Sequence, residues 1–293
     1  MNKLSIKERA AIVRLFVEGN SLRSCSRIAD ISINTVTGIL EKVGEACLKF
    51  HNDNVVNIPA KRVECDEIWS FVYAKEKNVP NTTRCNDPKV GDAWTFVGMD
   101  ADTKLIVSWL VGRRDAVCAN DFMYELSTRL RNRIQLTTDG FKPYIKAVEN
   151  AFENDIDFAQ LIKIYGLPEG NASERRYSPM KCTGSEKKWV SGDPNEALIS
   201  TSYIERQNLT MRMSMRRFTR LTNGFSKKME NHCYSIAIHF VYSNFCRVHK
   251  TLRVTPAMEA KLCDRVMSLE DVVRMAYTDE IEAENKRLAR RYR

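Results

Sequence analysis

The chain has 293 residues, 43% of them hydrophobic, so it can bury the core of one large domain or of two unequal ones. Its 46 Lys and Arg residues against 37 Asp and Glu residues give a net charge of +9, which favours a polyanionic partner, although a basic protein without such a partner has the same balance. The sequence contains no run of about 18 apolar residues and no signal-peptide pattern at its start, so we expect neither a membrane span nor secretion.

The cysteines are scattered in a way that excludes two common kinds of site. The nine cysteines contain no C-x-x-C pair, so neither a zinc ribbon nor a thioredoxin-like site is indicated. An odd number without a pattern is typical of reduced, mostly buried thiols. We therefore expect a cytoplasmic protein, associated with the nucleoid when it is bound to DNA.

Residues 1–48 predict an all-α domain of three short helices. Each predicted helix begins next to a serine, namely Ser5, Ser21 and Ser32, and serine is a preferred N-cap. The third helix is predicted over residues 33–43. Two short helices that are joined by a tight turn after a longer first helix form the pattern of a helix-turn-helix.

In a helix-turn-helix domain the start of the third helix enters the major groove of DNA. Asn34, Thr35 and Thr37 are placed there to reach base edges or phosphates. Arg23 and Arg27, on the second helix, could hold the DNA backbone. A small helical dimerisation module is the alternative interpretation.

Residues 49–61 are polar and contain one proline, so a linker is predicted there. The pattern then changes to a strand over residues 62–73, which is rich in β-branched and aromatic residues. Two adjacent acids, Asp66 and Glu67, interrupt this strand. Because strand residues alternate between faces, the two acids point opposite ways, and we expect only one of them to join a given site.

The following segments are predicted as a hairpin of two strands at 94–99 and 105–111, a helix at 116–130, a strand at 134–138 that ends in Asp139, and a helix at 144–152. This order is that of a ribonuclease H-like α/β core. We therefore expect a mixed five-stranded sheet with flanking helices within a catalytic domain at residues 62–255. In such a core the first strand is central and the strand after the first helix lies beside it, so Asp66 and Asp139 can meet.

Residues 153–199 fit this core poorly and are interpreted as an insertion. An apolar run at 158–165 predicts a strand, whereas 167–195 is rich in Gly, Pro, Ser and charge, as in a long loop. Residues 256–293 predict a charged helical tail, which could contact DNA, mediate oligomerisation or be a frayed helix.

The segment 200–228 has one carboxylate, Glu205, followed by seven Lys or Arg residues before the next acid. At 100° per residue, one polar stripe of a helix then contains Glu205, Asn208, Arg212 and Arg216. We interpret Glu205 as a metal-binding carboxylate on a helix that also contacts phosphate. Arg212 would clamp a phosphate, and Asn208, Arg216 and Arg217 would be further DNA contacts.

Asp66, Asp139 and Glu205 are candidate ligands for two Mg²⁺ ions, with Mn²⁺ as a potential substitute, because both ions prefer carboxylate oxygens. Two ions about 3.5–4 Å apart would activate the attacking oxygen and stabilise the leaving one in a phosphoryl displacement. Each residue also has a plain alternative: a strand-edge acid, a turn residue before Gly140, and an acid favoured by the helix dipole.

Three segments carry a resemblance to a known family: CDEIWSFV around Asp66, TTDGFKPY around Asp139, and YIERQNLTMRMSMRRFTRLTNGFSK around Glu205. They resemble the DDE transposases of bacterial and archaeal insertion sequences, in particular the group named after insertion sequence 1. The resemblance covers about residues 60 to 260. It implies that the three acids are catalytic metal ligands and that Arg212 contacts DNA.

The resemblance also implies a reaction and its partners. Element ends would be cleaved to free 3′-hydroxyls, which then attack target DNA, and the protein would act as a homo-oligomer on double-stranded terminal repeats and target. The chain departs from the group in lacking a cysteine zinc finger and in having a longer interval between Asp139 and Glu205. The alternatives are a catalytically inactive DNA-binding regulator and a structure-selective nuclease with the same core.

Overall fold

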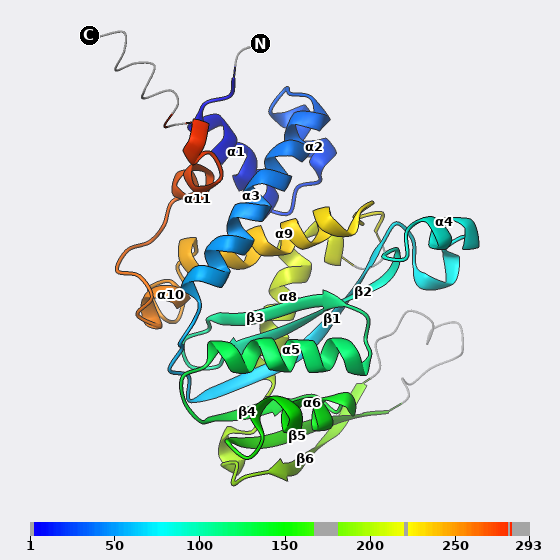
Figure 1. The fold of residues 1–293 in the computed structure, drawn as a ribbon, viewed down its shortest axis with the longest axis vertical. Coiled ribbons are helices and arrows are strands. Elements are labelled where there is room, and N and C mark those ends of the chain that lie inside the picture. The colour runs from blue at the N-terminus through cyan, green and yellow to red at the C-terminus, as the bar shows by residue number, and fades with distance from the viewer. Residues whose placement is uncertain (1–2, 167–180, 220–221, 281, 283–293) are drawn as a thin grey trace. The chain divides into compact units, whose positions relative to one another are not determined.

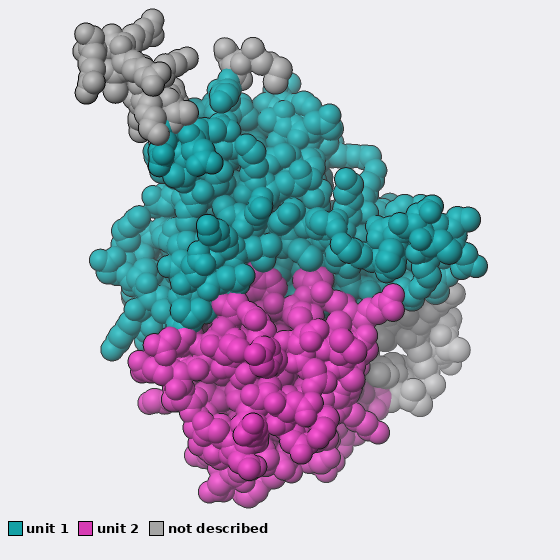
Figure 2. All heavy atoms as spheres, in the orientation of Figure 1, with its two compact units in different colours: residues 1–56, 69–95, 207–293 teal, residues 57–68, 96–206 magenta. Residues whose placement is uncertain are grey.

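The computed structural model describes residues 3–166, 181–219, 222–280 and 282. The chain forms two compact units, of which unit 1 comprises Met1–Val56, Trp69–Thr95 and Gln207–Arg293, and unit 2 comprises Asn57–Ile68 and Phe96–Arg206 (Figure 2). The division between the units therefore falls within continuous elements of the chain and differs from the predicted division at residues 48 and 62.

One mixed sheet has the strand order β3-β2-β1-β4-β5-β6 (Figure 1). Its strands are β1 (Arg62–Val72), β2 (Gly91–Asp100), β3 (Ile106–Gly112), β4 (Ile134–Thr138), β5 (Ile156–Gly166) and β6 (Lys181–Ser191). The expected strand at 158–165 is confirmed as β5. The expectation of five strands is corrected to six, because β6 lies in the segment that was predicted as a loop.

The sequence did not predict β6 because this strand is stabilised by its pairing with β5. Its sequence, KCTGSEKKWVS, has the composition of a loop, yet it pairs antiparallel with β5 from Phe158↔Ser191 to Gly166↔Lys181. The hydrogen-bond partners come from β5, so a strand of low intrinsic propensity is stabilised by its neighbour. The remainder of the predicted loop, residues 167–180, lies outside the described residues.

The pairing of β1 with β4 brings together two of the predicted site residues. β1 has β2 on one side and β4 on the other, as expected for the first strand. β1 and β4 are parallel, with register from Arg62↔Gln135 to Cys65↔Thr138. Asp66 and Asp139 are the next residues on their two segments, so the register carries both acids to the same end of the strand pair.

Two helices pack together in unit 2, α5 (Ala116–Arg129) and α6 (Pro143–Phe152) (Figure 1). The side chain of Asp115 caps α5 by accepting a hydrogen bond from the backbone N–H of Cys118. The buried ring of Phe96 lies 5.7 Å from that of Phe122 and 6.2 Å from that of Tyr144, measured between ring centroids. These buried rings join β2 to α5 and α6 in the core of unit 2.

Three helices begin unit 1: α1 (Ile6–Val17), α2 (Leu22–Ile28) and α3 (Ile33–Asn54). Their N-caps are Ser5, Ser21 and Ser32, as the sequence predicts. The third helix does not end at Val43 but continues to Asn54, into the predicted linker. Val43, Cys47 and His51 are buried at helical spacing, so tertiary packing extends the helix beyond the point where its sequence turns polar.

The remaining elements of the described residues are short helices and two helices of 13 residues each, α8 and α9. They are η1 (Glu76–Asn78), α4 (Asn81–Asn86), η2 (Glu196–Leu198, in unit 2), α8 (Ser202–Ser214), η3 (Arg216–Phe218), α9 (Met229–Val241), the π-helical η4 (Tyr242–Cys246), α10 (Pro256–Glu259) and α11 (Leu269–Ala276). α3 packs against α9 within unit 1. None of the described helices is long and apolar enough to cross a membrane.

The described part of the predicted tail packs within unit 1. α11 contacts α1 and α3, and the ring of Tyr277 lies 3.7 Å from the guanidinium carbon of Arg9. Glu280 forms an ion pair with Arg9 at 3.1 Å and with Lys42 at 3.2 Å. Residues up to Glu280 are therefore part of the helical unit. The basic end of the tail lies outside the described residues.

Candidate functional site

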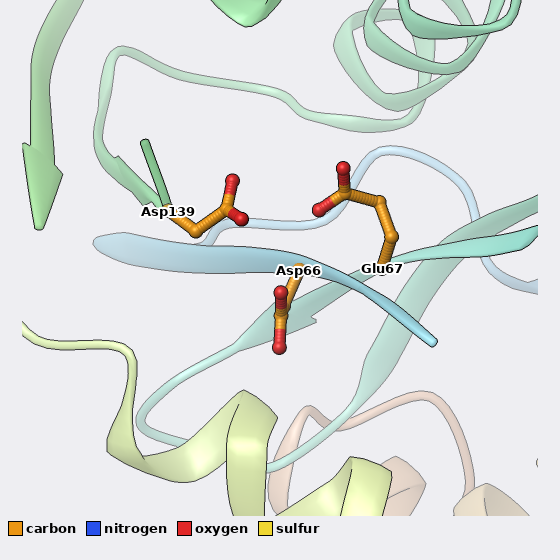
Figure 3. A group of neighbouring side chains, drawn as sticks. All are labelled: Asp66, Glu67 and Asp139. Atoms are coloured by element: carbon orange, nitrogen blue, oxygen red, sulfur yellow. The ribbon is translucent and has the colours of Figure 1, made fainter. Parts of the chain in front are cut away.

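Three carboxylates meet in unit 2, from Asp66, Glu67 and Asp139 (Figure 3). One oxygen of each lies within 4.8 Å of those of the other two. Asp66 and Glu67 point to opposite sides of β1, as the pleat requires (Figure 3). The expectation that only one of them could join a site is wrong, because a carboxylate oxygen of each lies within 4.8 Å of one from Asp139.

A cation that the sequence did not single out lies in this group. Nε of Arg114 lies 3.1 Å from Oε1 of Glu67, and its Nη2 lies 3.6 Å from Oδ2 of Asp139. The guanidinium carbon is 4.0 Å from the centroid of the Phe141 ring, which supports it from one side. Arg114 thus bridges the two acids. In the sequence, Arg114 follows Arg113 in a loop after a strand, and no local pattern indicates a role in a site.

Burial and like charge dominate the electrostatics of the group. Burial raises the pKa of Glu67 to about 8; the charges of Asp139 and Asp66 act in the same direction, and Arg114 opposes them. Burial also raises the pKa of Asp139, whereas the N–H of Phe141 lowers it by donating to Oδ1 at 3.0 Å. Such closely spaced acids gain from a bound cation, which would remove both the repulsion and the cost of burial.

Glu205 stands next to this group rather than within it. It lies in the first turn of α8, where Oε1 accepts a hydrogen bond of 2.5 Å from the hydroxyl of Thr201 and Oε2 pairs with Lys163 of β5. Its charge raises the pKa of Asp139, so the two carboxylates interact electrostatically. Thr201 and Lys163 were not predicted, since their role depends on contacts made across the fold.

The donor set fits a hard divalent cation. Three carboxylates with converging oxygens are the ligands that Mg²⁺ and Mn²⁺ prefer, and Glu205 is close enough to act on one of them. No cysteine or histidine belongs to the group in the described residues, so its chemistry is that of an oxygen site. The sequence located Asp66 and Asp139 and missed Glu67 and Arg114.

The residues predicted to bind DNA in the helical module are placed differently from one another. Arg23, Arg27 and Asn34 are exposed, and Thr35 is half-buried. The hydroxyl of Thr37 donates to the backbone carbonyl of Ile33 at 2.9 Å, within the helix. Three of the five side chains are therefore exposed, and of these Arg27 also donates from Nη2 to Oγ of Ser24 at 3.5 Å.

The residues predicted to bind DNA along and after α8 also divide into two groups. Arg216 is exposed and Arg212 half-buried. Asn208 is 2% exposed, which does not fit a contact with DNA. Arg217 turns inward: its Nε donates to Oγ of Ser226 at 2.6 Å and its Nη1 to Oγ of Ser235, and burial lowers its pKa to about 10. The predicted DNA contact of Arg217 is corrected to an internal one.

No protein-family model matches this chain, and no curated protein matches its sequence. Among solved structures, the piggyBac transposase synaptic complex with hairpin DNA aligns over 93% of this chain and 69% of its own, with 12% identity and a TM-score of 0.39. The Mos1 strand transfer complex aligns over 82% and 76%, with 13% identity and a TM-score of 0.24. The Mos1 transposase paired-end complex gives the same coverage, with 12% identity and a TM-score of 0.25. Similarity this low assigns neither a family nor a function.

Proposed function

We propose that this chain is a DNA transposase of the DDE type, with cleavage of element ends followed by transfer of the 3′-hydroxyls into target DNA. The observation that carries the proposal is the meeting of Asp66 and Asp139 at one end of the β1–β4 pair, with Glu205 in electrostatic contact with Asp139. These are the three acids at the centre of the segments that resemble the insertion sequence 1 group.

The acidic site would hold Mg²⁺, or Mn²⁺ in its place. Asp66 and Asp139 would provide the principal ligands, and Glu67 would add a third carboxylate. Glu205, whose charge acts on Asp139, would complete the set from α8. A divalent ion bound there supplies charge stabilisation for an attacking and a leaving oxygen on phosphorus. Two ions are the proposed number, as in other enzymes that displace phosphoryl groups in line.

The protein's own residues would bind and orient the DNA. Arg212 and the exposed Arg216 would contact DNA phosphates. Residues 1–48 would recognise the terminal repeats through the exposed Asn34 and the half-buried Thr35, with Arg23 and Arg27 on the backbone. Residues 62–255 would form the catalytic domain. We propose a homo-oligomer that pairs two ends, in the cytoplasm and on the nucleoid.

The test uses a duplex built from the DNA that flanks the reading frame, with any inverted repeat that this DNA contains. We expect nicking at the repeat end with Mg²⁺ or Mn²⁺, and loss of nicking in Asp66→Asn, Asp139→Asn and Glu205→Gln while DNA binding survives. Asp157→Asn is the matched control, because this carboxylate accepts the N–H of Asp193 and pairs with Arg133, away from the acidic group. Nicking that persists in all three site variants would contradict the proposal.

Two further outcomes identify the alternatives. Nicking without joining of the cleaved end to a target duplex indicates a structure-selective nuclease. Tight repeat binding without any metal-dependent nicking indicates an inactive regulator. Affinity alone cannot separate the three functions, because each of them binds phosphates and is weakened by salt.

A further inference from the structure

A buried carboxylate on β1 joins this strand to the start of α8. Oε2 of Glu64 accepts hydrogen bonds from the backbone N–H groups of Tyr203, at 2.9 Å, and Ile204, at 3.0 Å. Glu64 is 3% exposed. The first N–H groups of a helix have no partner within the helix, and a carboxylate that accepts from them is favoured both by hydrogen bonding and by the helix dipole.

The local residue that would normally cap this helix is engaged elsewhere. Thr201 immediately precedes α8, the position at which a threonine hydroxyl commonly accepts from the first turn. Here the hydroxyl donates to Oε1 of Glu205 at 2.5 Å, and the backbone carbonyl of Thr201 accepts from the N–H of Glu205 at 3.0 Å. The capping function is therefore performed by Glu64, from a strand that is 139 residues away in sequence.

The position of this cap relates it to the acidic site. Glu64 and Asp66 are two residues apart on β1, so their side chains leave the same face of the strand. Glu205 follows directly after Ile204, whose N–H the cap holds. One carboxylate thus ties the strand that carries Asp66 to the helical turn that carries Glu205. A second contact holds the same turn, since Nζ of Lys104 lies 3.4 Å from the centroid of the Tyr203 ring.

We infer that Glu64 is a positioning residue of the acidic site, which fixes the first turn of α8 on β1 so that Glu205 stands within electrostatic reach of Asp139. The inference rests on the proposed function, in which Glu205 helps to hold a divalent ion. Glu64 itself touches neither the ion nor DNA. Its loss lets the turn move, and Glu205 then no longer completes the ligand set.

The test measures Mn²⁺ binding by calorimetry on the full chain, together with thermal unfolding. Substitution of a residue that orients a metal ligand typically lowers metal affinity by about 10–100-fold. We expect Glu64→Ala to weaken Mn²⁺ binding by about this factor, and Glu64→Gln to weaken it less, because its amide oxygen still accepts from the two N–H groups. Asp157→Asn, which weakens the ion pair of a half-buried carboxylate with Arg133 in the same unit, is expected to leave Mn²⁺ affinity unchanged.

The kinetics of nicking provide a second measurement, of kcat and KM for the repeat duplex. Because Glu64 is buried and does not face DNA, kcat should fall in Glu64→Gln while KM for the repeat duplex is unchanged. A folded Glu64→Ala protein that binds Mn²⁺ as the wild type does would overturn the inference, and so would an equal loss in Asp157→Asn. A wild-type protein that binds no Mn²⁺ would instead overturn the proposed metal site, and the inference with it.

Should the Glu64 variants fail to fold, the wild-type protein tests the same link. Coupling between two sites is reciprocal, so if Glu64 and the metal site are connected, Mn²⁺ must stabilise the cap. We expect amide hydrogen exchange in a peptide covering residues 202–206 to slow on addition of saturating Mn²⁺. Exchange that Mn²⁺ leaves unchanged would overturn the inference.

Discussion

Nε of Arg114 lies 3.1 Å from Oε1 of Glu67, whose side chain is only 1% exposed. Among the charges around Glu67, Asp139 and Asp66 disfavour its ionised form, and Arg114 favours it. The same guanidinium reaches Asp139. Arg114 is therefore a fixed positive charge within the acidic group. Its partners, Glu67 and Asp139, are also two of the candidate ligands of a bound cation.

Removing Arg114 should destabilise the protein through Glu67. Arg114→Ala leaves a buried carboxylate without its cationic partner, at a cost of about 1–3 kcal/mol in the free energy of unfolding. Glu67→Gln in the same chain should recover most of this loss, since a neutral amide needs no counter-charge. Urea unfolding of both single variants and the double variant at pH 9, where Glu67 with its pKa of about 8 is ionised, measures the coupling. Strictly additive losses would show that the pair does not interact.

The free energy of unfolding should decrease as the pH falls below about 6.5, because two histidines are buried. Burial lowers the pKa of His232 to about 3 and that of His239 to about 4. Below pH about 6.5 the unfolded chain binds protons that the folded chain does not, so the free energy of unfolding decreases as pH falls towards these values. Each histidine contributes a slope of up to about 1.4 kcal/mol per pH unit.

His239→Leu isolates one of these contributions. In the described part of the chain, neither ring nitrogen of His239 has a hydrogen-bond partner, so leucine removes a titrating group without removing a hydrogen bond. Urea unfolding between pH 7 and 5 should give a shallower loss of stability in the variant than in the wild type. Parallel curves for the two proteins would contradict the assigned environment of His239.

Two glycines of α3 should respond oppositely to alanine. A Cβ added at Gly44 would lie 2.3 Å from Cβ of Tyr234 on α9, so Gly44→Ala forces the two helices apart and should cost about 1–3 kcal/mol of stability. A Cβ at Gly38 has no atom within 4 Å among the described residues, so Gly38→Ala should stabilise by about 0.5–1 kcal/mol through helix propensity. Equal effects on Tm would contradict the α3–α9 contact.

Adjacent arginines after α8 should separate DNA binding from stability. Arg216→Met removes an exposed charge and should reduce the salt slope of DNA affinity by about 1, with little change in Tm. Arg217→Met deprives Ser226 and Ser235 of their donor and should cost about 1–3 kcal/mol of stability, with little change in the salt slope. Binding titrations at several salt concentrations and thermal melts distinguish the two. The reverse pattern would restore Arg217 as a DNA contact.

Features encoded within a few residues could be read from the sequence. Ser5, Ser21 and Ser32 were located as helix N-caps because a cap and the N–H groups that it accepts from lie within three residues of each other. The meeting of Asp66 and Asp139 was also foreseeable. It follows from the order of the strands, and the β1–β4 register confirms it.

Features that depend on distant partners were decided only by the tertiary structure. β6 has no strand-like composition and exists because β5 supplies its hydrogen bonds. Arg217 looked like its neighbour Arg216 until the fold placed two serine hydroxyls beside it. The bond between Glu64 and the start of α8 joins residues 139 apart, and the Arg114–Glu67 pair joins residues 47 apart. The sequence by itself determined that Asp66 and Asp139 assemble, because strand order constrains the backbone. The contacts that position those acids, such as the Arg114–Glu67 pair, depend on side-chain packing between distant segments. A local sequence pattern does not predict such packing.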